Sequence, residues 1–396
     1  MKRKIFHSHL VCPALATAVA AILFSSPEIH AQSKWQHAEN EYKQVNLVSS
    51  GYVTAKVTDP NLINPWGMVA GKTPIWISDQ GTNTSSIYSI AMVEAGSGAL
   101  FAVKIPMEPG PVNGPTGIVF NSSSNAFEVP SVTGMVPSLF IFANLNGTIS
   151  GWNPGSTGGK ASAVVAVDNH KAGATYTGLA LGMVGTNTYL YACNFTPQGG
   201  VEVYDSSFQP AKGMYWKWFD SDDYLPRLSH DKIWRPYNIA NLNGKMYVAY
   251  AAMPATGGLP ITHQGLGVIA VFTPKGKFLR VLAKGGNLDA PWGMTMAPDK
   301  FGKFSNDLLV GNFGNGRILA YAPKHANKRK DRDDDRQDMF AGMLRDSNHQ
   351  VIENGFLWTL MFGNGVDGAD PHTLYISTGG PNQATDGLLA AITAQP

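Results

Sequence analysis

The sequence predicts an all-β protein built from one repeated unit, and three observations support this. Only 15% of the 396 residues are charged, whereas long exposed helices need many Lys and Glu side chains. Almost no stretch shows the 3.6-residue apolar periodicity of an amphipathic helix. Short runs of aromatic and β-branched residues alternate with Gly-rich turns along most of the chain, which is typical of strands joined by tight hairpins.

A six-residue phrase, in which a turn leads into a short apolar strand, recurs at intervals of 50 to 66 residues. Its six copies are 64–69, 114–119, 175–180, 235–240, 290–295 and 356–361. Each copy is followed by a second strand, at 75–79, 139–144, 190–194, 246–251, 308–312 and 374–378. Third strands follow five of these. Six repeats of about four strands each predict a six-bladed β-propeller.

Closure of the ring can also be predicted. The last repeat contains three strands, and a further strand-like segment at 44–49 precedes the first repeat. An open ring would leave unpaired backbone groups on two sheets, so we expect this N-terminal strand to complete the last blade as its outer member. The alternative to a propeller is an irregular β-sandwich, but a sandwich would not repeat the same six-residue phrase six times.

We expect a signal peptide at 1–31 and a single propeller domain at 32–396. Residues 2–4 are Lys-Arg-Lys, an apolar run follows at 10–24, and a small residue precedes a cleavage point before Gln32. The apolar run is shorter than the roughly 20 residues that span a bilayer, which makes an uncleaved anchor the weaker alternative. The mature chain is then secreted or periplasmic and carries no membrane span.

The number and distribution of charged residues argue against nucleic acid as a partner and indicate one surface loop. The net charge of +2 gives no strong basic field of the kind that attracts nucleic acid. A block of mixed-sign charges falls within about 324–338, between two apolar strands. Such a block is typical of a solvated loop, so we interpret it as a loop insertion in the propeller.

The order of the strands resembles the NHL type of propeller. Several strings are also similar to those of a family of uncharacterised secreted bacterial proteins. These strings are 45–49, 59–67, 290–293, 309–316 and 362–365. The resemblance covers most of residues 42–394 and implies the fold and export without an assigned activity. Similar proteins tend to carry His-Gly-Leu-Phe-Gly near the end, where this chain has Asp-Gly-Leu-Leu-Ala at 386–390.

The last residue of each second strand is the candidate functional position, because equivalent positions of all blades gather around one face of a propeller. These residues are Asp79, Asn144, Asn194, Ala251, Asn312 and Thr378. Asp and Asn oxygens suit Ca²⁺, so one hypothesis is a calcium site at Asp79, Asn144, Asn194 and Asn312, with Thr378 in the same ligand-binding ring. The alternative is that these side chains cap strand ends by bonding to nearby backbone.

Three classes of function follow. The preferred one is an exported propeller that binds a small molecule, a glycan or a protein at its axial face. The second is a Ca²⁺-dependent hydrolase, by analogy with lactonase and gluconolactonase propellers, which hold a catalytic Ca²⁺ with Asn and Asp side chains. The third is a structural or matrix-associated protein. Five aromatic residues either stack on a ligand or pack between blades, namely Trp66, Tyr176, Tyr237, Trp292 and Trp358. Whether the protein is an enzyme stays open.

The export hypothesis makes a direct prediction. If the N-terminal segment is a signal peptide, the exported protein begins near Gln32. Intact-mass measurement of protein recovered outside the cytoplasm should show this shortened chain. Recovery of an exported chain that still begins at Met1 would contradict the hypothesis.

Overall fold

The computed structural model describes residues 41–106, 108, 112–214, 225–323 and 339–395. The predicted signal peptide at 1–31 and the predicted charged loop at 324–338 lie outside these residues. Within them, α1 (Ile90–Glu94) and three short 3₁₀ turns are the helical elements. None of the helices in the described part of the chain is long and apolar enough to cross a bilayer.

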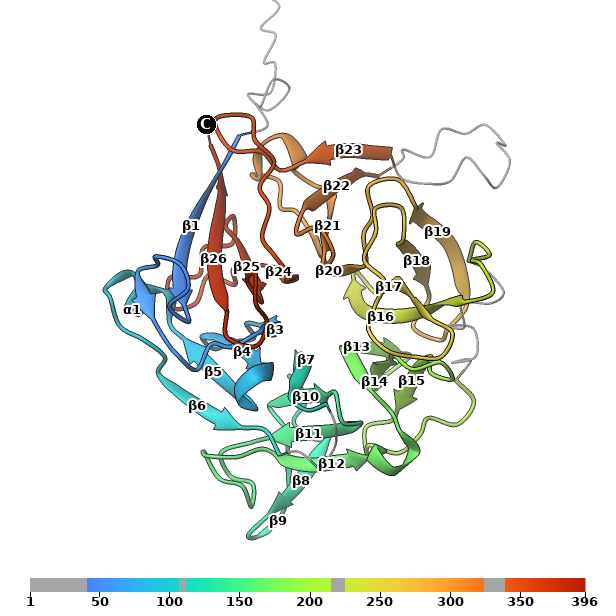
Figure 1. Ribbon diagram of the computed structural model, residues 1–396. Coiled ribbons are helices and arrows are strands. Elements are labelled where there is room, and N and C mark those ends of the chain that lie inside the picture. The colour runs from blue at the N-terminus through green and yellow to red at the C-terminus, as the bar shows by residue number, and fades with distance from the viewer. Residues whose placement is uncertain (1–40, 107, 109–111, 215–224, 324–338, 396) are drawn as a thin grey trace, which may run out of the picture.

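Six sheets stand around a central axis, which confirms the predicted six-bladed propeller (Figure 1). The first three blades are β3 (Pro65–Val69), β4 (Ile75–Asp79), β5 (Thr84–Tyr88) and β6 (Phe101–Lys104); β7 (Pro115–Phe120), β10 (Phe140–Asn144), β11 (Thr148–Trp152) and β12 (Val164–Asp168); and β13 (Tyr176–Val184), β14 (Asn187–Asn194) and β15 (Val201–Tyr204). A separate hairpin, β8 (Glu128–Ser131) and β9 (Gly134–Pro137), projects from the second blade.

The remaining three blades complete the ring. They are β16 (Lys232–Leu242), β17 (Lys245–Pro254), β18 (Val268–Phe272) and β19 (Phe278–Lys284); β20 (Pro291–Met296), β21 (Leu308–Asn312), β22 (Ile318–Ala322) and β23 (Met339–Met343); and β24 (Leu357–Phe362), β25 (Leu374–Thr378), β26 (Leu388–Ala394), β1 (Tyr42–Ser49) and β2 (Val57–Thr58). In every blade the first strand along the repeat lies innermost (Figure 1).

The predicted closure by the N-terminal strand is confirmed. β1 pairs antiparallel with β26, from Tyr42 opposite Ala394 to Ser49 opposite Leu388. The two-residue β2 adds in parallel beyond β1, so β1 is the fourth strand of the last blade and β2 is its short outer edge. The hydroxyl of Tyr42 donates to the carbonyl oxygen of Phe301 at 3.1 Å, which also ties the N-terminal strand to the fifth blade.

The hydrophobic core lies between the blades. Because side chains alternate along a strand, each strand packs against both neighbouring blades. In β4, Ile75 and Ile77 pack against residues of the sixth blade, whereas Trp76 stacks on Phe140 of the second blade with ring centroids 3.9 Å apart. Burial of such side chains contributes about 1.5–3 kcal/mol each, so the joints between blades hold the ring together.

At the axis the inner strands approach so closely that four of them carry glycine at the point of contact. A Cβ atom on Gly117 would lie 2.6 Å from the backbone nitrogen of Leu179, and one on Gly293 would lie 2.4 Å from the carbonyl oxygen of Trp358. Gly67 and Gly178 meet the neighbouring blade at similar separations. Each repeated phrase therefore supplies glycine, or a polar residue, where backbones touch.

Side chains of the inner strands also donate hydrogen bonds to backbone carbonyl oxygens of the next blade. The four bonds are Thr116 Oγ1 to Tyr176 at 2.7 Å, Thr177 Oγ1 to Tyr237 at 2.8 Å, Asn238 Nδ2 to Trp292 at 2.8 Å and Thr359 Oγ1 to Trp66 at 2.7 Å. In addition, the pairing of inner and second strand shifts register in all six blades beside these positions. Such a bulge re-aims the side chains that follow it.

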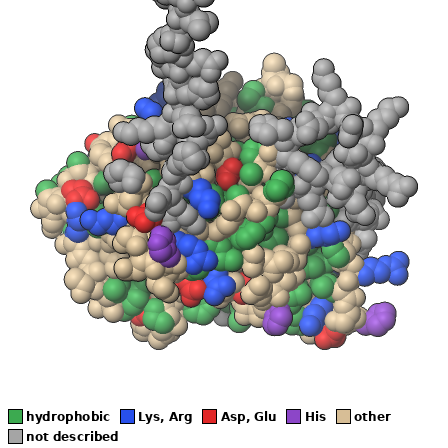
Figure 2. Space-filling view, turned by 90° about the horizontal axis from the view of Figure 1, so that it is seen from above, with side chains coloured by type: hydrophobic (Ala, Val, Ile, Leu, Met, Phe, Trp, Pro, Cys, Tyr) green, Lys and Arg blue, Asp and Glu red, His purple; other side chains and the backbone are tan. Residues whose placement is uncertain are grey.

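Charged side chains are dispersed over the side of the propeller. Figure 2 shows Lys and Arg interspersed with Asp and Glu among hydrophobic and neutral polar groups. This distribution agrees with the net charge of +2.

Candidate functional site

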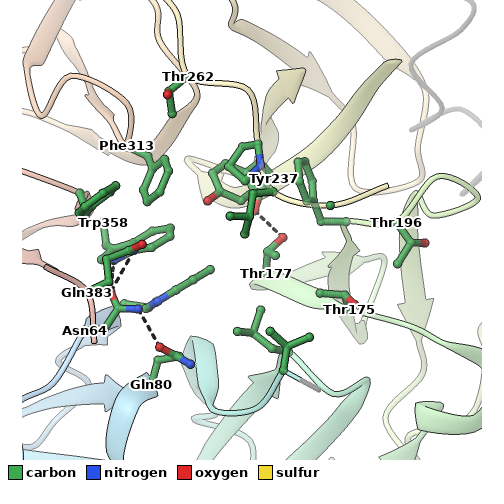
Figure 3. A pocket seen from close by; sticks show the side chains of 18 of the residues that line it. Asn64, Gln80, Thr175, Thr177, Thr196, Tyr237, Thr262, Phe313, Trp358 and Gln383 are labelled. Atoms are coloured by element: carbon green, nitrogen blue, oxygen red, sulfur yellow. Dashed lines mark hydrogen bonds between the residues drawn. The ribbon is translucent and has the colours of Figure 1, made fainter. Parts of the chain in front are cut away.

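A cavity of about 720 Å³ opens at one end of the central axis (Figure 3). Its walls come from the loops that lead into the inner strands, from the residues that follow the second strands, and from the long loop between β17 and β18. All the described side chains that line it are uncharged. A second, smaller space of about 120 Å³ lies along the inner strands and is lined by the contact glycines.

The floor of the cavity is aromatic. Trp66 and Trp358, from the first and sixth blades, stack with ring centroids 3.5 Å apart. Tyr237 of the fourth blade meets Trp66 edge-on at 6.5 Å, and Phe313, which follows β21, contacts Trp358 at 4.5 Å. Beneath them Trp292 meets both Trp66 and Trp358 edge-on, at 6.2 and 5.7 Å. These rings meet across the axis and close the cavity from below.

The indole N–H groups of the floor differ in whether they have a hydrogen-bond acceptor. The indole nitrogen of Trp358 donates to Asn64 Oδ1 at 2.9 Å, and that of Trp292 donates to the carbonyl oxygen of Thr177 at 3.1 Å. The indole nitrogen of Trp66 is buried and has no partner among the described residues. Burial also raises the pKa of the Tyr237 phenol, so this side chain stays neutral across the physiological range.

A chain of amides forms one wall. Asn64 Oδ1 accepts from Trp358 and also from Gln383 Nε2 at 3.3 Å, while Asn64 Nδ2 donates to Gln80 Oε1 at 2.7 Å. Gln80 Nε2 then donates to the carbonyl oxygen of Asn113 at 2.6 Å. Asn64 has a φ of 45°, in the left-handed region that Asn tolerates better than most residues. Figure 3 shows these amides on one side of the cavity and Thr175, Thr177, Thr196 and Tyr237 on the other.

Of the five aromatic candidates from the sequence, Trp66, Tyr237 and Trp358 line the cavity. The residues predicted at the ends of the second strands instead lie just behind it, and none of them lines it. They are Asp79, Asn144, Asn194, Asn312 and Thr378, all of them buried. The residues that directly follow the first four do line the cavity, namely Gln80, Leu145, Phe195 and Phe313. The lining of the cavity is thus displaced by one residue from the predicted ring.

Three of the predicted residues make the same hydrogen bond. The side-chain oxygens of Asn144, Asn194 and Asn312 accept from the backbone nitrogens of Gly114, Thr175 and Asp289, at 3.1, 3.0 and 3.1 Å. Each acceptor therefore fastens the loop that leads into the inner strand of its own blade. Thr378 Oγ1 accepts from the backbone nitrogen of Gly380 at 3.0 Å.

Asn194 is also held by a hydrogen-bonded cluster of Glu202, Tyr176 and Tyr204. Its Nδ2 donates to Glu202 Oε1 at 2.8 Å, and the hydroxyl groups of Tyr176 and Tyr204 donate to Glu202 Oε2 at 2.5 and 2.7 Å. Tyr176, one of the five candidate stacking residues, is thus hydrogen-bonded behind the wall. The cluster positions Thr175, which does line the cavity.

Asp79 is fully buried, and its carboxyl group is only half satisfied. Oδ2 accepts from the backbone nitrogen of Ser86 at 2.9 Å and from Thr84 Oγ1 at 3.3 Å, whereas Oδ1 has no partner among the described residues. Burial raises the pKa of this carboxyl group well above its ordinary value.

The predicted calcium ligands do not form a ready site. The amide oxygens of the three Asn residues already accept backbone N–H groups. No group of three or more His, Cys, Asp or Glu side chains is placed to hold a metal ion in the described part of the chain. The side-chain oxygens of these residues therefore do not fit Ca²⁺ in this arrangement. The calcium hypothesis stays a prediction from the sequence.

The fold and the cavity define the class of protein: a six-bladed β-propeller with an aromatic-floored cavity on its axis. The chain belongs to the family of the uncharacterized protein R648 of Acanthamoeba polyphaga mimivirus, to which it is 30% identical over 287 residues, covering 72% of this chain and 68% of R648. It is 30% identical to R640 of the same virus, covering 66% of this chain and 46% of R640, and 29% identical to L690, covering 69% of each. These relatives do not support a bacterial, secreted setting.

No model of a known protein family matches the chain. Solved structures with some similarity include BBS1N in complex with ARL6DN (TM-score 0.40, 12% identity, 84% of this chain and 78% of that one). Others are a Bacteroides thetaiotaomicron protein of unknown function (0.48, 11%, 89% and 76%) and a Thermus thermophilus putative oxidoreductase, glucose dehydrogenase (0.47, 12%, 89% and 99%). Similarity at this level supports no statement on activity.

The buried Asp79 predicts a pH dependence of stability. In the unfolded chain an Asp ionises above about pH 4, whereas the raised pKa keeps Asp79 protonated in the folded protein. Between these two pKa values, unfolding releases a proton from Asp79. The contribution of Asp79 to the free energy of unfolding is therefore fully present below about pH 4. It is lost as pH rises toward the pKa of the folded state, by up to about 1.4 kcal/mol per pH unit. Asp79→Asn imitates the protonated acid and should remove this loss.

Urea unfolding at several pH values from about 4 to 8 measures the effect. The free energy of unfolding of the wild type should fall relative to that of Asp79→Asn as pH rises. Glu128→Gln is the control, because Glu128 is exposed on β8 and its substitution should leave the wild-type dependence unchanged. Parallel curves for the wild type and Asp79→Asn would show that Asp79 is ionised in the folded protein.

Proposed function

We propose that the protein binds an uncharged organic molecule in the axial cavity. One observation carries this proposal: about 720 Å³ of space lies over a floor of packed aromatic rings, and every described lining side chain is uncharged. Cavities of roughly 300–1,000 Å³ with mostly apolar walls and a few oriented polar groups are typical of small-molecule sites.

The lining favours a neutral ligand on physical grounds. A charged ligand that enters such a cavity loses hydration and gains no opposite charge from the wall. A neutral ligand with apolar surface gains about 25 cal/mol for each Å² removed from water, and its polar atoms can pair with the amides and hydroxyl groups of the walls.

Binding is favoured over hydrolysis. Hydrolysis by this cavity requires a general base within reach of the substrate. Tyr237 is the one ionisable side chain among the described lining residues, and its raised pKa makes it a poor base at neutral pH. We therefore place binding first and keep the hydrolase as the alternative.

We also propose that the protein acts outside the cytoplasm. The proposal rests on the N-terminal sequence, in which a basic start, an apolar run and a small residue precede Gln32. The ligand would then be met in the periplasm or the surrounding medium.

Filling the cavity tests the proposed function. Thr175→Trp places an indole in the cavity wall, whereas Thr133→Trp places one on the exposed turn between β8 and β9. Thermal shift with a panel of neutral aromatic compounds, neutral sugars and charged aromatic compounds should reveal neutral compounds that raise the melting temperature of the wild type. Saturation at 100 times Kd stabilises by about 2.7 kcal/mol.

The two variants should respond differently to those compounds. Thr133→Trp should keep the shifts and Thr175→Trp should lose them, provided that both variants melt cooperatively without ligand. Equal shifts in Thr175→Trp would place binding elsewhere on the molecule. Shifts that occur only with charged compounds would contradict the proposal.

A further inference from the structure

The amide of Gln383 has an unused hydrogen-bonding edge. Gln383 is half-buried in the loop between β25 and β26, and its side chain lines the cavity. A primary amide carries two N–H donors and two acceptor sites on its oxygen. One N–H bonds to Asn64 Oδ1 at 3.3 Å. The second N–H and Oε1 have no partner among the described residues.

The orientation of this edge is fixed by the residues beneath it. The indole N–H of Trp358 can only donate, so the atom of Asn64 that it meets must be Oδ1. That oxygen can only accept, so the atom of Gln383 that it meets must be Nε2. Asn64 Nδ2 is thereby turned to Gln80. The chain of bonds leaves one N–H of Gln383 and its Oε1 without partners among the described residues, and Figure 3 shows Gln383 beside Asn64 at the cavity.

The rest of the cavity suits a body with apolar faces. Its floor consists of aromatic rings, which favour stacked or edge-on contact with another ring. At the rim, Leu259 is 81% exposed and Val112 is 47% exposed. Exposed apolar side chains around a cavity mouth are typical of a site that covers apolar surface. A ligand covered with hydroxyl groups would leave several of them unpaired against these residues.

On the basis of the proposed function, we propose that the ligand is a flat, neutral, ring-bearing molecule with a lactam- or imide-like edge. Its carbonyl oxygen accepts from the free N–H of Gln383 and its ring N–H donates to Oε1. Paired contacts of this kind, in which an amide side chain meets the edge of a heterocycle, discriminate between edges by about 5- to 150-fold in affinity. The rings of the ligand lie against the aromatic floor.

Matched probes test this edge. 1,8-Naphthalimide presents an imide N–H between two carbonyl groups, and N-methyl-1,8-naphthalimide carries a methyl group in place of that donor. Titration calorimetry or fluorescence should show that the wild type binds the imide at least about fivefold more tightly than its N-methyl form. Naphthalene, which has no polar edge, and cellobiose complete the set.

Gln383→Met removes both polar atoms of the side chain at similar volume, so it should bring the ratio of the two imide affinities close to one. Gln350→Met is the matched control, because Gln350 does not line the cavity, and it should keep the wild-type ratio. The ratio isolates the edge contact from any general loosening of the site, because loosening weakens both probes alike.

Each other outcome overturns a distinct statement. Equal binding of the two imides by the wild type, or an unchanged preference in Gln383→Met, refutes the edge contact. Binding of cellobiose without binding of the imide replaces the ligand class but leaves the proposed function intact. Failure of all four probes contradicts the edge inference, and the broader panel with Thr175→Trp then decides the proposed function independently.

Discussion

The close approach of the inner strands around the axis is the constraint on which the rest of the structure depends. Gly117 and Gly293 sit where any Cβ atom would collide with the backbone of the next blade. Because the strands meet so closely, Thr177 and Asn238 can donate directly to carbonyl oxygens of the neighbouring blade. The central channel of the propeller is thereby narrow enough for a few large aromatic rings to fill it.

The aromatic floor of the cavity is a consequence of that narrow central channel. Trp66, Tyr237 and Trp358 come from blades that are far apart in sequence, yet they meet because their inner strands begin at the same level of the axis. Hydrogen bonds that strand-end side chains accept from backbone N–H groups of the loops then position the walls. Asn194, fastened by Glu202, holds Thr175 at the cavity. Position along the strand, rather than local motif, decides which side chains face the cavity.

The fold could be predicted because its signals are local and repeated. The six phrases, the strands after them and the spare segment at 44–49 all appear in order along the chain. The lining of the cavity could be predicted in part. Trp66, Tyr237 and Trp358 line it, whereas the predicted strand-end ring lies one residue away from it. Simple alternation does not hold at the strand ends, since register shifts between Tyr176 and Gly178, and between Pro236 and Asn238, turn the following side chains.

The amide wall could not be predicted from local sequence at all. Asn64, Gln80 and Gln383 come from three different connections between strands, and the bond between Asn64 and Gln383 joins residues 319 positions apart. Only closure of the ring brings the first and last repeats together. The left-handed backbone at Asn64 does not mark this wall either, because Ala290 and Phe356, at the equivalent positions of two other blades, adopt it too.

The measurement that most directly tests this account compares two glycine substitutions by urea unfolding. Gly117→Ala introduces a methyl group at the contact between blades, whereas a Cβ on Gly200 would meet no atom within 4 Å. The account predicts that Gly117→Ala lowers the free energy of unfolding by about 1–3 kcal/mol, as overpacking does, while Gly200→Ala changes it by less than about 0.5 kcal/mol. Equal stability of the two variants would contradict the claim that the inner strands approach too closely at the axis to accommodate a Cβ atom.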